Sequence, residues 1–331
     1  MSVAIDVVNP IESFSYLLYM AAPVTHSHPS VLASPFRVDD SDTYQRWRDA
    51  KLEDYPSRAE DLIVEVRNPL ALTAGERTEM LVRLRKTNMV IYACRGGDFS
   101  DKRVPRAIGT QFGLVHLDDN LLADEDSISS LRVMPEKSGR GYIPYSNKRL
   151  LWHTDGYYNI PDKYVRAFVL HCVTPAAAGG ENCLLDPEIT YIRLRDEEPE
   201  LIRAFMALDA MTIPANEESG AMRAAVSGPV FSIDPRSGSL HMRYTARSRS
   251  IRWRNDKATH AAATRLAEIL SETSHYHFFH RLESGQGLLC NNVLHNRTSF
   301  VDDMDSGRVR LLYRARYHDR VDGTGLGEAR E

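Results

Sequence analysis

A histidine and an aspartate two residues apart are the side chains in this sequence best placed for chemistry. His153 and Asp155 occur in the segment RLLWHTDGYYN, at the end of a predicted strand. Residues two apart on a strand share one face, so both side chains should point the same way. With a third ligand from another strand, they would form a set of two histidines and one carboxylate with open coordination positions. That set suits Fe(II), which must bind a cosubstrate and oxygen together.

The C-terminal region supplies a third ligand and a group of arginines. His295 ends a predicted strand in the run GLLCNNVLHNRTSF, and the strand VRLLYRARY follows one loop later. A period of two predicts that four arginines share one face of this second strand: Arg308, Arg310, Arg314 and Arg316. Buried guanidinium groups need anionic partners, and the arginine fork matches a carboxylate. An arginine here could hold the far carboxylate of a metal-bound dicarboxylate, and 2-oxoglutarate has that shape.

Four motifs together resemble those of a known family of Fe(II)- and 2-oxoglutarate-dependent oxygenases, the taurine dioxygenase, clavaminate synthase and γ-butyrobetaine hydroxylase family. WHTDG resembles the proximal metal motif, AAAGGENCLLD the glycine-rich turn, NNVLHNRTSF the distal histidine motif and RLLYRA the closing strand with two arginines. The resemblance covers roughly Leu72 to Tyr317. It implies an oxidoreductase, a dioxygenase that hydroxylates a small-molecule substrate with Fe(II), 2-oxoglutarate and O2 and releases succinate and CO2.

The resemblance also implies roles for single residues. The residues implied in iron binding are His153, Asp155 and His295. Arg310 would pair with the far carboxylate of 2-oxoglutarate, and Arg314 would contact an anionic group of the substrate. Asn182 stands where the family usually has threonine, and its amide can also donate a hydrogen bond to the cosubstrate.

Further substrate contacts are expected near the metal motif, each with a plainer alternative. Tyr157 and Tyr158 follow the motif directly, but tyrosine is also a common strand and core residue. Arg243 lies in LHMRYTARSR, which resembles a substrate-facing segment of some relatives or else a basic surface strand. A histidine cluster at the end of a predicted helix is interpreted as packing rather than as a second metal site: His275, His277 and His280.

Several reaction types remain open from the sequence. Halogenases of this broader class replace the metal-binding carboxylate with a small residue, so Asp155 argues against halogenation. Hydroxylation is the leading interpretation, and desaturation by the same chemistry is an alternative. A non-catalytic metal- and ligand-binding barrel and a hydrolytic zinc enzyme with the same three ligands are the rivals. An arginine placed for 2-oxoglutarate discriminates against both.

The elements expected to position these residues are mostly short strands. The β-like segments are YVRAFVLHCV, GPVFSID, SLHMRYTAR, GLLCNNVLHN and VRLLYRARY. Helices are predicted for LTAGERTEMLVRLRKTN, with Thr73 and Glu76 as a capping box, and for KATHAAATRLAEILSETSHYHFFHRL, the longest. This pattern, without regular β-α alternation, predicts an α+β protein with a double-stranded β-helix (jelly-roll) core and flanking helices.

Three segments are predicted along the chain. Residues 1–55 should form an irregular lead-in that packs on the body, residues 56–320 the jelly-roll oxygenase domain, and residues 321–331 a flexible tail. The formal charge of −4 provides no basic field for nucleic acid or an anionic membrane, and no apolar run is long enough to span a bilayer. Four scattered cysteines suggest reduced thiols and a cytoplasmic protein. A homo-oligomer is also compatible with the sequence, because symmetric dimers are the commonest assemblies of soluble proteins.

Overall fold

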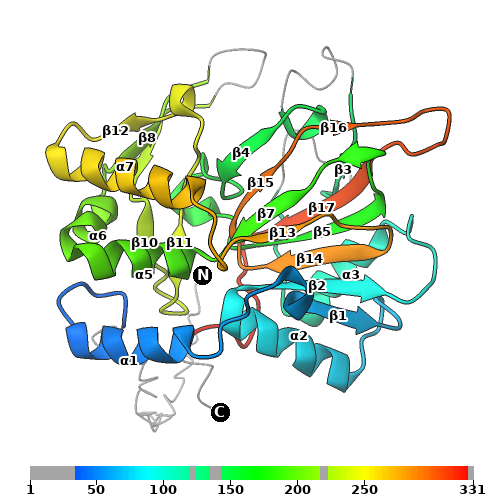
Figure 1. The fold of residues 1–331 in the computed structure, drawn as a ribbon, viewed down its shortest axis with the longest axis horizontal. Helices are drawn as coiled ribbons and strands as arrows, with labels where there is room; N and C mark the ends of the chain where they lie inside the picture. Colours follow the sequence, from blue (N-terminus) through cyan, green and yellow to red (C-terminus); the bar gives the residue numbers. More distant parts are fainter. Residues whose placement is uncertain (1–33, 119–123, 125, 135–142, 217–222, 327–331) are drawn as a thin grey trace, which may run out of the picture. The chain divides into compact units, whose positions relative to one another are not determined.

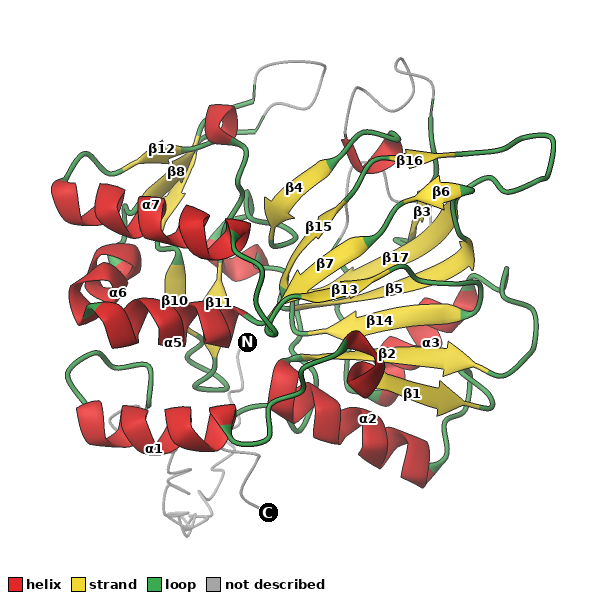
Figure 2. Cartoon of the chain, viewed as in Figure 1, coloured by secondary structure: helices red, strands yellow, loops and turns green. Residues whose placement is uncertain are grey.

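Two β-sheets that share an apolar core form the centre of the structure (Figures 1 and 2). The computed structural model describes residues 34–118, 124, 126–134, 143–216 and 223–326. Within these residues, no helix has the length and apolar character needed to cross a membrane.

The larger sheet has six strands in the order β1, β2, β14, β5, β17, β3. These strands are β1 (Ile63–Val66), β2 (Met89–Cys94), β3 (Ser129–Leu131), β5 (Ala167–Thr174), β14 (Gln286–Cys290) and β17 (Leu311–Tyr317). Neighbouring strands are antiparallel except β1 and β2, which run parallel. Much of β5 is buried on both faces, because the smaller sheet covers one face and helices cover the other.

The smaller sheet has four antiparallel strands in the order β13, β7, β15, β4. These strands are β4 (Leu150–His153), β7 (Asn182–Leu185), β13 (Phe278–His280) and β15 (Leu294–Arg297). Side chains from both sheets meet in one core, which includes Phe168, Leu184, Phe278, Cys290 and Leu312. Polar residues on the inner faces of the two sheets are therefore brought close together.

Two helices cover the outer face of the larger sheet (Figure 1). They are α2 (Ala74–Thr87) and α3 (Arg103–Gln111). The predicted capping box of α2 is confirmed, since Thr73 Oγ1 accepts from the Glu76 amide at 3.2 Å and Glu76 accepts from the Thr73 amide at 2.7 Å. The helix ends at Asn88, which adopts a left-handed conformation with φ of +58°.

Between β7 and β13 the chain forms a helical layer with its own core. Its helices are α5 (Pro187–Glu197), α6 (Pro199–Met206) and α7 (Lys257–Ser271). Its small sheets contain β8 (Met211–Ile213), β9 (Val226–Gly228), β12 (Arg252–Trp253), β10 (Phe231–Ile233) and β11 (Leu240–Met242). As predicted, α7 is the longest helix among the described residues, but it ends at Ser271 instead of continuing to Leu282. The predicted C-terminal part of this helix contains β13 instead.

The remaining elements are short. The 3₁₀ turns are Ala59–Leu62, Ile143–Tyr145, Pro161–Lys163 and Ser248–Ser250, and a two-residue ladder joins β6 (Ala178–Gly179) to β16 (Phe300–Val301). The sheets and helices confirm the predicted α+β class. One predicted strand is wrong: GLLCNNVLHN divides at Asn291 and Asn292 into β14 and β15, which belong to different sheets.

The predicted irregular lead-in, residues 1–55, contains one regular helix. This helix is α1 (Ser41–Leu52), and Tyr44 donates a 2.6 Å hydrogen bond from it to Asp196 of α5. The expectation of irregular structure is therefore wrong for this stretch. Residues 1–33 of the predicted lead-in lie outside the described residues.

The predicted flexible tail, residues 321–331, begins with a packed segment. Val321 is buried, and its amide donates to Asn291 Oδ1 at 3.1 Å. Leu326 packs against the core of the helical layer. The tail prediction is wrong for residues 321–326, and residues 327–331 lie outside the described part of the chain.

Candidate metal centre

His153 and His295 face each other across two neighbouring strands. His153 is the last residue of β4, and His295 is its register partner on β15. Directly opposed residues of an antiparallel pair point to the same face, and the two imidazole rings lie 4.1 Å apart between centroids. Residues that are distant in the sequence thus meet on the inner face of the smaller sheet.

Asp155 joins this pair from the turn that follows β4. One ligand atom from each of His153, Asp155 and His295 lies within 4.8 Å of the others, and His153 Nε2 is 3.7 Å from the Asp155 carboxylate. The turn needs a glycine next, because Gly156 has φ of +66° and a Cβ there would lie 2.6 Å from Val165 Cγ2. In the described residues, this is the one group of three or more potential ligands close enough to share a metal ion.

Both imidazoles are oriented by backbone carbonyls. His153 Nδ1 lies 2.9 Å from the carbonyl of Leu151, and His295 Nδ1 lies 2.9 Å from that of Val293. Because these carbonyls can only accept, they assign the proton to Nδ1 and leave each Nε2 with a lone pair. The arrangement favours the neutral tautomer that binds a metal.

Electrostatics favours the metal-binding protonation states of Asp155 and His295. Burial raises the pKa of the Asp155 carboxyl, but the cations of Arg314 and Arg316 outweigh it and hold that pKa well below its usual range. Arg314 NH1 lies 3.2 Å from both Asp155 oxygens. Burial, reinforced by His153, lowers the pKa of His295 to about 3. The carboxyl is therefore ionised and His295 is neutral at physiological pH.

Three of the four arginines predicted on one strand face lie inside the protein: Arg310, Arg314 and Arg316. Arg308 does not, because it is exposed in the loop before β17 and lies 3.9 Å from Asp303. The predicted four-arginine face is wrong for this residue. Arg316 forms an ion pair with Asp118 and donates to the Tyr158 hydroxyl at 3.1 Å. The charge of Arg316 is therefore neutralised within the protein.

Arg310 is a buried cation with an unused donor. It is 4% exposed, and its NH1 has no hydrogen-bond partner among the described residues. Burial lowers the pKa of its guanidinium to about 10. The Phe300 ring lies 5.0 Å from the guanidinium carbon, a cation-π contact that neutralises no charge. An unpaired buried guanidinium of this kind fits a ligand that brings a carboxylate.

The glycine-rich turn lies beside Arg310, because a Cβ at Gly180 would be 3.9 Å from Arg310 Nε. Gly179 has φ of +70°, and a Cβ there would lie 2.3 Å from the Ser299 carbonyl, so the turn passes directly against the segment before β16. Asn182 is the register partner of Arg297, two positions from the pair Leu184 and His295. A period of two therefore puts Asn182 on the same face as His295.

Tyr157 and Tyr158 follow Asp155 in the chain, and both are partly buried against the core of the helical layer. Their rings lie 5.2 Å apart in an edge-to-face arrangement. Burial raises the pKa of the Tyr157 phenol, and the nearby Arg247 cation partly offsets this. Arg247 follows Thr245, which bridges His153 in the backbone. Arg247 could not be identified from the sequence, because this bridge brings together distant parts of the chain.

Arg243 was expected to contact the substrate, but its side chain is buried and contacts the backbone instead. It is 1% exposed, and its guanidinium donates to four backbone carbonyls, those of Met211, Val226, Gly228 and Pro229. These donors hold the backbone around β8 and β9, so the guanidinium has no free edge for a substrate.

Replacing Arg243 with methionine is expected to lower the free energy of unfolding by at least about 3 kcal/mol, because several buried carbonyls lose their donor. Lysine should not restore the loss, since a single ammonium cannot reach four acceptors. Urea unfolding measures the effect, with Arg236→Met at an exposed site as the control. A loss below about 1 kcal/mol would contradict the structural role.

The histidine cluster near residue 280 has partners of its own. His277 Nδ1 lies 2.8 Å from Ser274 Oγ, and His280 Nε2 lies 2.9 Å from Gln286 Oε1. These contacts agree with the interpretation that the cluster is structural.

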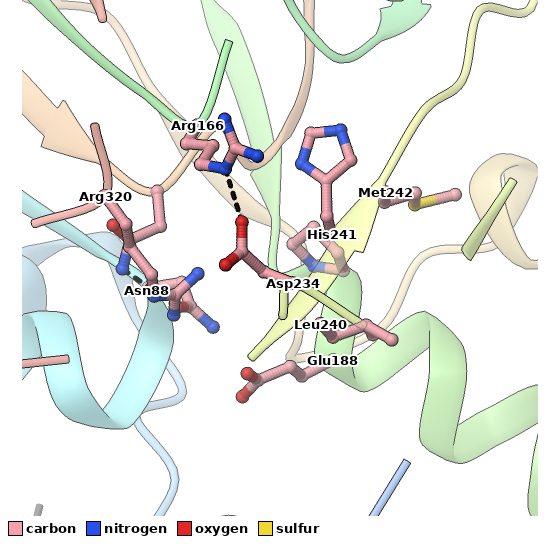
Figure 3. A pocket seen from close by; sticks show the side chains of 10 residues that line it. Asn88, Arg166, Glu188, Asp234, Leu240, His241, Met242 and Arg320 are labelled. Carbon is pink, nitrogen blue, oxygen red and sulfur yellow. Dashed lines mark hydrogen bonds and ion pairs between the residues drawn. The ribbon is translucent and has the colours of Figure 1, made fainter. Parts of the chain in front are cut away.

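A second polar region lies away from the metal centre, around a cavity of about 20 Å³ (Figure 3). Its lining includes Arg166, Asp234 and His241, and Arg166 pairs with Asp234. The His241 ring stacks on Tyr164, with centroids 4.5 Å apart. Burial, reinforced by the Arg166 cation, lowers the pKa of His241 to about 3.

His241 should make the protein less stable in mild acid. Its folded pKa lies below the usual value near 6.5, so the unfolded chain binds the proton more tightly, and stability present at pH 7 is lost as the pH falls from about 6.5 toward 3. One such group contributes at most about 1.4 kcal/mol per pH unit. Urea unfolding at pH 7, 6 and 5 should show a shallower decline for His241→Gln than for wild type. His260→Gln, at an exposed position, is the control, and equal slopes for wild type and His241→Gln would contradict the prediction.

Comparison with known proteins gives a family match over two thirds of the chain. Residues 95–316 match the family described as taurine catabolism dioxygenase TauD, TfdA family. Uridine-5'-phosphate dioxygenase from Streptomyces sp is 30% identical over 220 residues, which are 63% of this chain and 76% of that protein. Trimethyllysine dioxygenase from Meyerozyma guilliermondii is 25% identical over 164 residues, 47% of this chain and 40% of that protein.

Solved structures share the fold at low sequence identity. An asparagine oxygenase in complex with Fe(II), 2S,3S-3-hydroxyasparagine and succinate matches with a TM-score of 0.53 and 15% identity, over 87% of this chain and 88% of that chain. A taurine dioxygenase from Burkholderia xenovorans matches with a TM-score of 0.51 and 17% identity, over 78% of this chain and 87% of that chain.

Proposed function

This chain belongs to the taurine catabolism dioxygenase TauD, TfdA family, and from this premise we propose a specific site for its reaction. His153, Asp155 and His295 bind Fe(II), and Arg310 and Asn182 bind 2-oxoglutarate. The enzyme hydroxylates a small-molecule substrate and forms succinate and CO2. When bound, the iron and 2-oxoglutarate supply the activation of oxygen for this oxidation.

The observation that carries this proposal is the unpaired guanidinium of Arg310. A metal site of two histidines and one carboxylate alone would also suit a hydrolytic zinc enzyme or a non-catalytic metal-binding barrel. Neither rival explains a buried arginine whose NH1 has no partner among the described residues. A dicarboxylate that chelates the iron at one end and meets Arg310 at the other accounts for both features.

The surrounding residues have supporting tasks. Arg314 keeps Asp155 ionised and oriented through NH1, and its buried Nε, which lacks a hydrogen-bond partner in the described structure, remains available to a bound ligand. Tyr157 and Tyr158 exclude water from one side of the site and contact the substrate. Arg243 is left out of this set because its Nε, NH1 and NH2 groups each donate to backbone carbonyls.

The two sheets support a finer description of the fold. We propose that they are the two halves of a double-stranded β-helix, with residues 56–320 as one oxygenase unit, because their inner faces share a core and together supply the site. Four scattered cysteines, none in a disulfide, support a reducing compartment, which we propose is the cytoplasm.

For the substrate, we propose a small molecule with an anionic group. Arg247 and Arg314 provide cations near the metal ligands, and among the described residues Arg247 has no acidic partner. The Streptomyces relative bears the name of a uridine-5'-phosphate dioxygenase, a protein named for a phosphate ester. Hydroxylation is favoured, with desaturation as the alternative, since both use the same site.

The proposal is tested by succinate formation from 2-oxoglutarate with Fe(II) and O2. The screen covers nucleoside phosphates, phosphonates, sulfonates, amino acids and betaines, and mass analysis of the product separates a gain of one oxygen from a loss of two hydrogens. Substrate-dependent succinate is the expected result. Absence of succinate with every substrate and in uncoupled turnover, from protein that binds Fe(II), would point to the non-catalytic barrel.

A further inference from the structure

We propose that Asn292 is a positioning residue for the metal-binding carboxylate Asp155, anchored through Asn291 to a buried polar network that ends at Lys51. The inference rests on the proposed function of His153, Asp155 and His295 as the iron site. It concerns how the Asp155 backbone, which lies beyond the end of β4, is held in place.

The Asn292 amide pairs with the Asp155 backbone at both of its polar groups. Asn292 Oδ1 accepts from the Asp155 amide at 2.8 Å, and Nδ2 donates to the Asp155 carbonyl at 2.9 Å. The second Nδ2 proton goes to the Val165 carbonyl at 2.6 Å. The opposite amide orientation would set donor against donor at the first contact, so the geometry fixes the rotamer. One side chain thereby holds Asp155 and ties it to the segment before β5.

Asn292 adopts a conformation that needs compensation. Its φ is +49°, a left-handed value that is costly for a residue other than glycine, and the residue is 3% exposed. Asparagine tolerates this conformation better than most residues. The three side-chain hydrogen bonds offset the remaining cost, so the left-handed turn between β14 and β15 can place the Asn292 amide against the Asp155 backbone.

Asn291 fixes the other side of the same turn. Its backbone amide donates to the Asn88 carbonyl at 2.8 Å, and its Nδ2 donates to Asn88 Oδ1 and Thr324 Oγ1, each at 3.1 Å. Asn88 is the left-handed residue that ends α2, and its own Nδ2 donates to Asp186 Oδ1 at 3.0 Å. The turn is therefore joined to α2 and to the start of α5.

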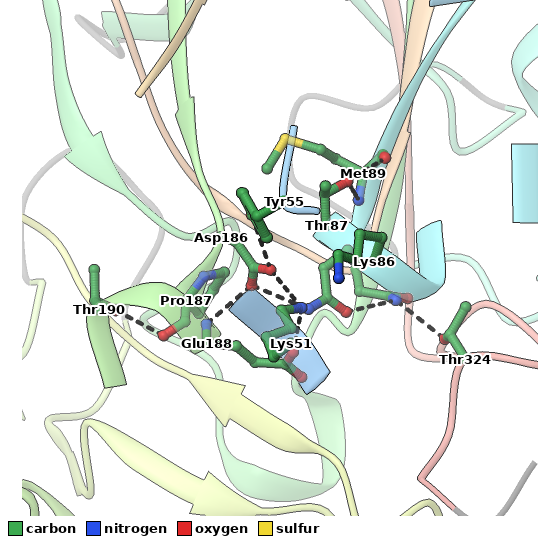
Figure 4. Close-up of polar contacts among 12 residues, drawn as sticks. Lys51, Tyr55, Lys86, Thr87, Met89, Asp186, Pro187, Glu188, Thr190 and Thr324 are labelled. Atoms are coloured by element: carbon green, nitrogen blue, oxygen red, sulfur yellow. Dashed lines mark hydrogen bonds and ion pairs between the residues drawn. The ribbon is translucent and has the colours of Figure 1, made fainter. Parts of the chain in front are cut away.

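The network ends at a buried lysine (Figure 4). Lys51 Nζ lies 2.7 Å from Asp186 and 2.5 Å from Glu188, and all three residues are buried. Removing one partner of such a cluster leaves an uncompensated charge, so the cluster resists rearrangement. The Asn291–Asn292 turn is thereby connected through hydrogen bonds and ion pairs to α1, α2 and α5, which hold it in place.

The test compares Co(II) binding by wild type and Asn292→Gly. Co(II) is a redox-stable probe for the site, and its visible absorption bands report ligand geometry. Glycine accepts a positive φ but lacks the amide, so it removes the hydrogen bonds to Asp155 without straining the backbone. We expect Co(II) to bind about 10- to 100-fold more weakly, the usual effect of losing a partner of a metal ligand, and we expect altered absorption bands.

Asn68→Gly is the matched control, because Asn68 is exposed and, among the described residues, its side chain accepts only from the Leu70 amide. Asn292→Asp is a second variant for the case that the glycine variant does not fold. It keeps the acceptor for the Asp155 amide but loses both donors, and it should bind Co(II) several-fold more weakly. Wild-type affinity and spectrum in whichever of these two variants folds would overturn the positioning role.

This outcome differs from a failure of the iron site itself. If wild type binds no Co(II), or if His153→Ala binds it as well as wild type, the proposed metal centre is wrong and the positioning role falls with it. If wild type binds Co(II), His153→Ala does not, and a folded Asn292 variant binds like wild type, only the positioning role is wrong.

Discussion

Replacing His153 with alanine is expected to remove bound iron and to lower kcat/KM by a factor on the order of 10³ or more, because a metal ligand supports several kcal/mol of transition-state stabilisation. The imidazole is held by the Leu151 carbonyl and faces His295 across the sheet. Among the described residues, no fourth histidine, cysteine or carboxylate belongs to this group of potential ligands. Iron content after anaerobic loading and succinate formation are the two measurements.

His260→Ala is the control for this substitution, since His260 is an exposed histidine on α7. It should keep wild-type iron content and activity. Retention of iron and turnover within about twofold of wild type by His153→Ala would show that the three-residue cluster does not hold the catalytic metal.

Replacing Arg310 with methionine should weaken 2-oxoglutarate binding and stabilise the apoprotein. The KM for 2-oxoglutarate should rise about 30-fold or more, because loss of a buried charge pair costs about 2 to 5 kcal/mol. The apoprotein should become more stable by about 1 to 3 kcal/mol, because an unpaired guanidinium is removed from a site that is 4% exposed. Steady-state kinetics with varied 2-oxoglutarate and urea unfolding without ligands measure the two effects.

Arg308→Met separates the role of Arg310 from general loss of positive charge. Arg308 lies two residues earlier and is exposed, so neither KM nor stability should change appreciably. An Arg310→Met protein that binds 2-oxoglutarate normally would exclude Arg310 as its carboxylate partner. An Arg310→Met apoprotein that is less stable than wild type would show that the guanidinium has a structural role as well.

Features encoded by short-range pattern could be predicted from the sequence. The capping box at Thr73 and Glu76 is local, and α2 forms where it was expected. The spacing of His153 and Asp155 already indicated a shared site, and the structure brings their ligand atoms together with His295.

Features that depend on distant partners could not be predicted in this way. The sequence shows Asn291 and Asn292 within one apolar run, which led to the prediction of a single strand. In the structure the chain turns at these two residues, with Asn292 left-handed, and passes from one sheet to the other. The contact of Arg314 NH1 with the Asp155 carboxylate was not predicted either, because the two residues are far apart in the chain. The helix at Ser41–Leu52 was missed because few of its residues are apolar and its packing partner, α5, is far along the chain.

The pairing of His153 with His295 has a consequence for synthesis of the protein. The whole helical layer, β13 and β14 lie between these two residues in the chain, so the ribosome must translate all of them before the second imidazole exists. Because long-range strand pairing is a late and slow event in folding, a nascent chain cannot hold the metal ion until β15 has docked beside β4. Loading of the metal should therefore occur only after β15 has been translated and has docked, and an incomplete chain released before this point should not carry a redox-active ion.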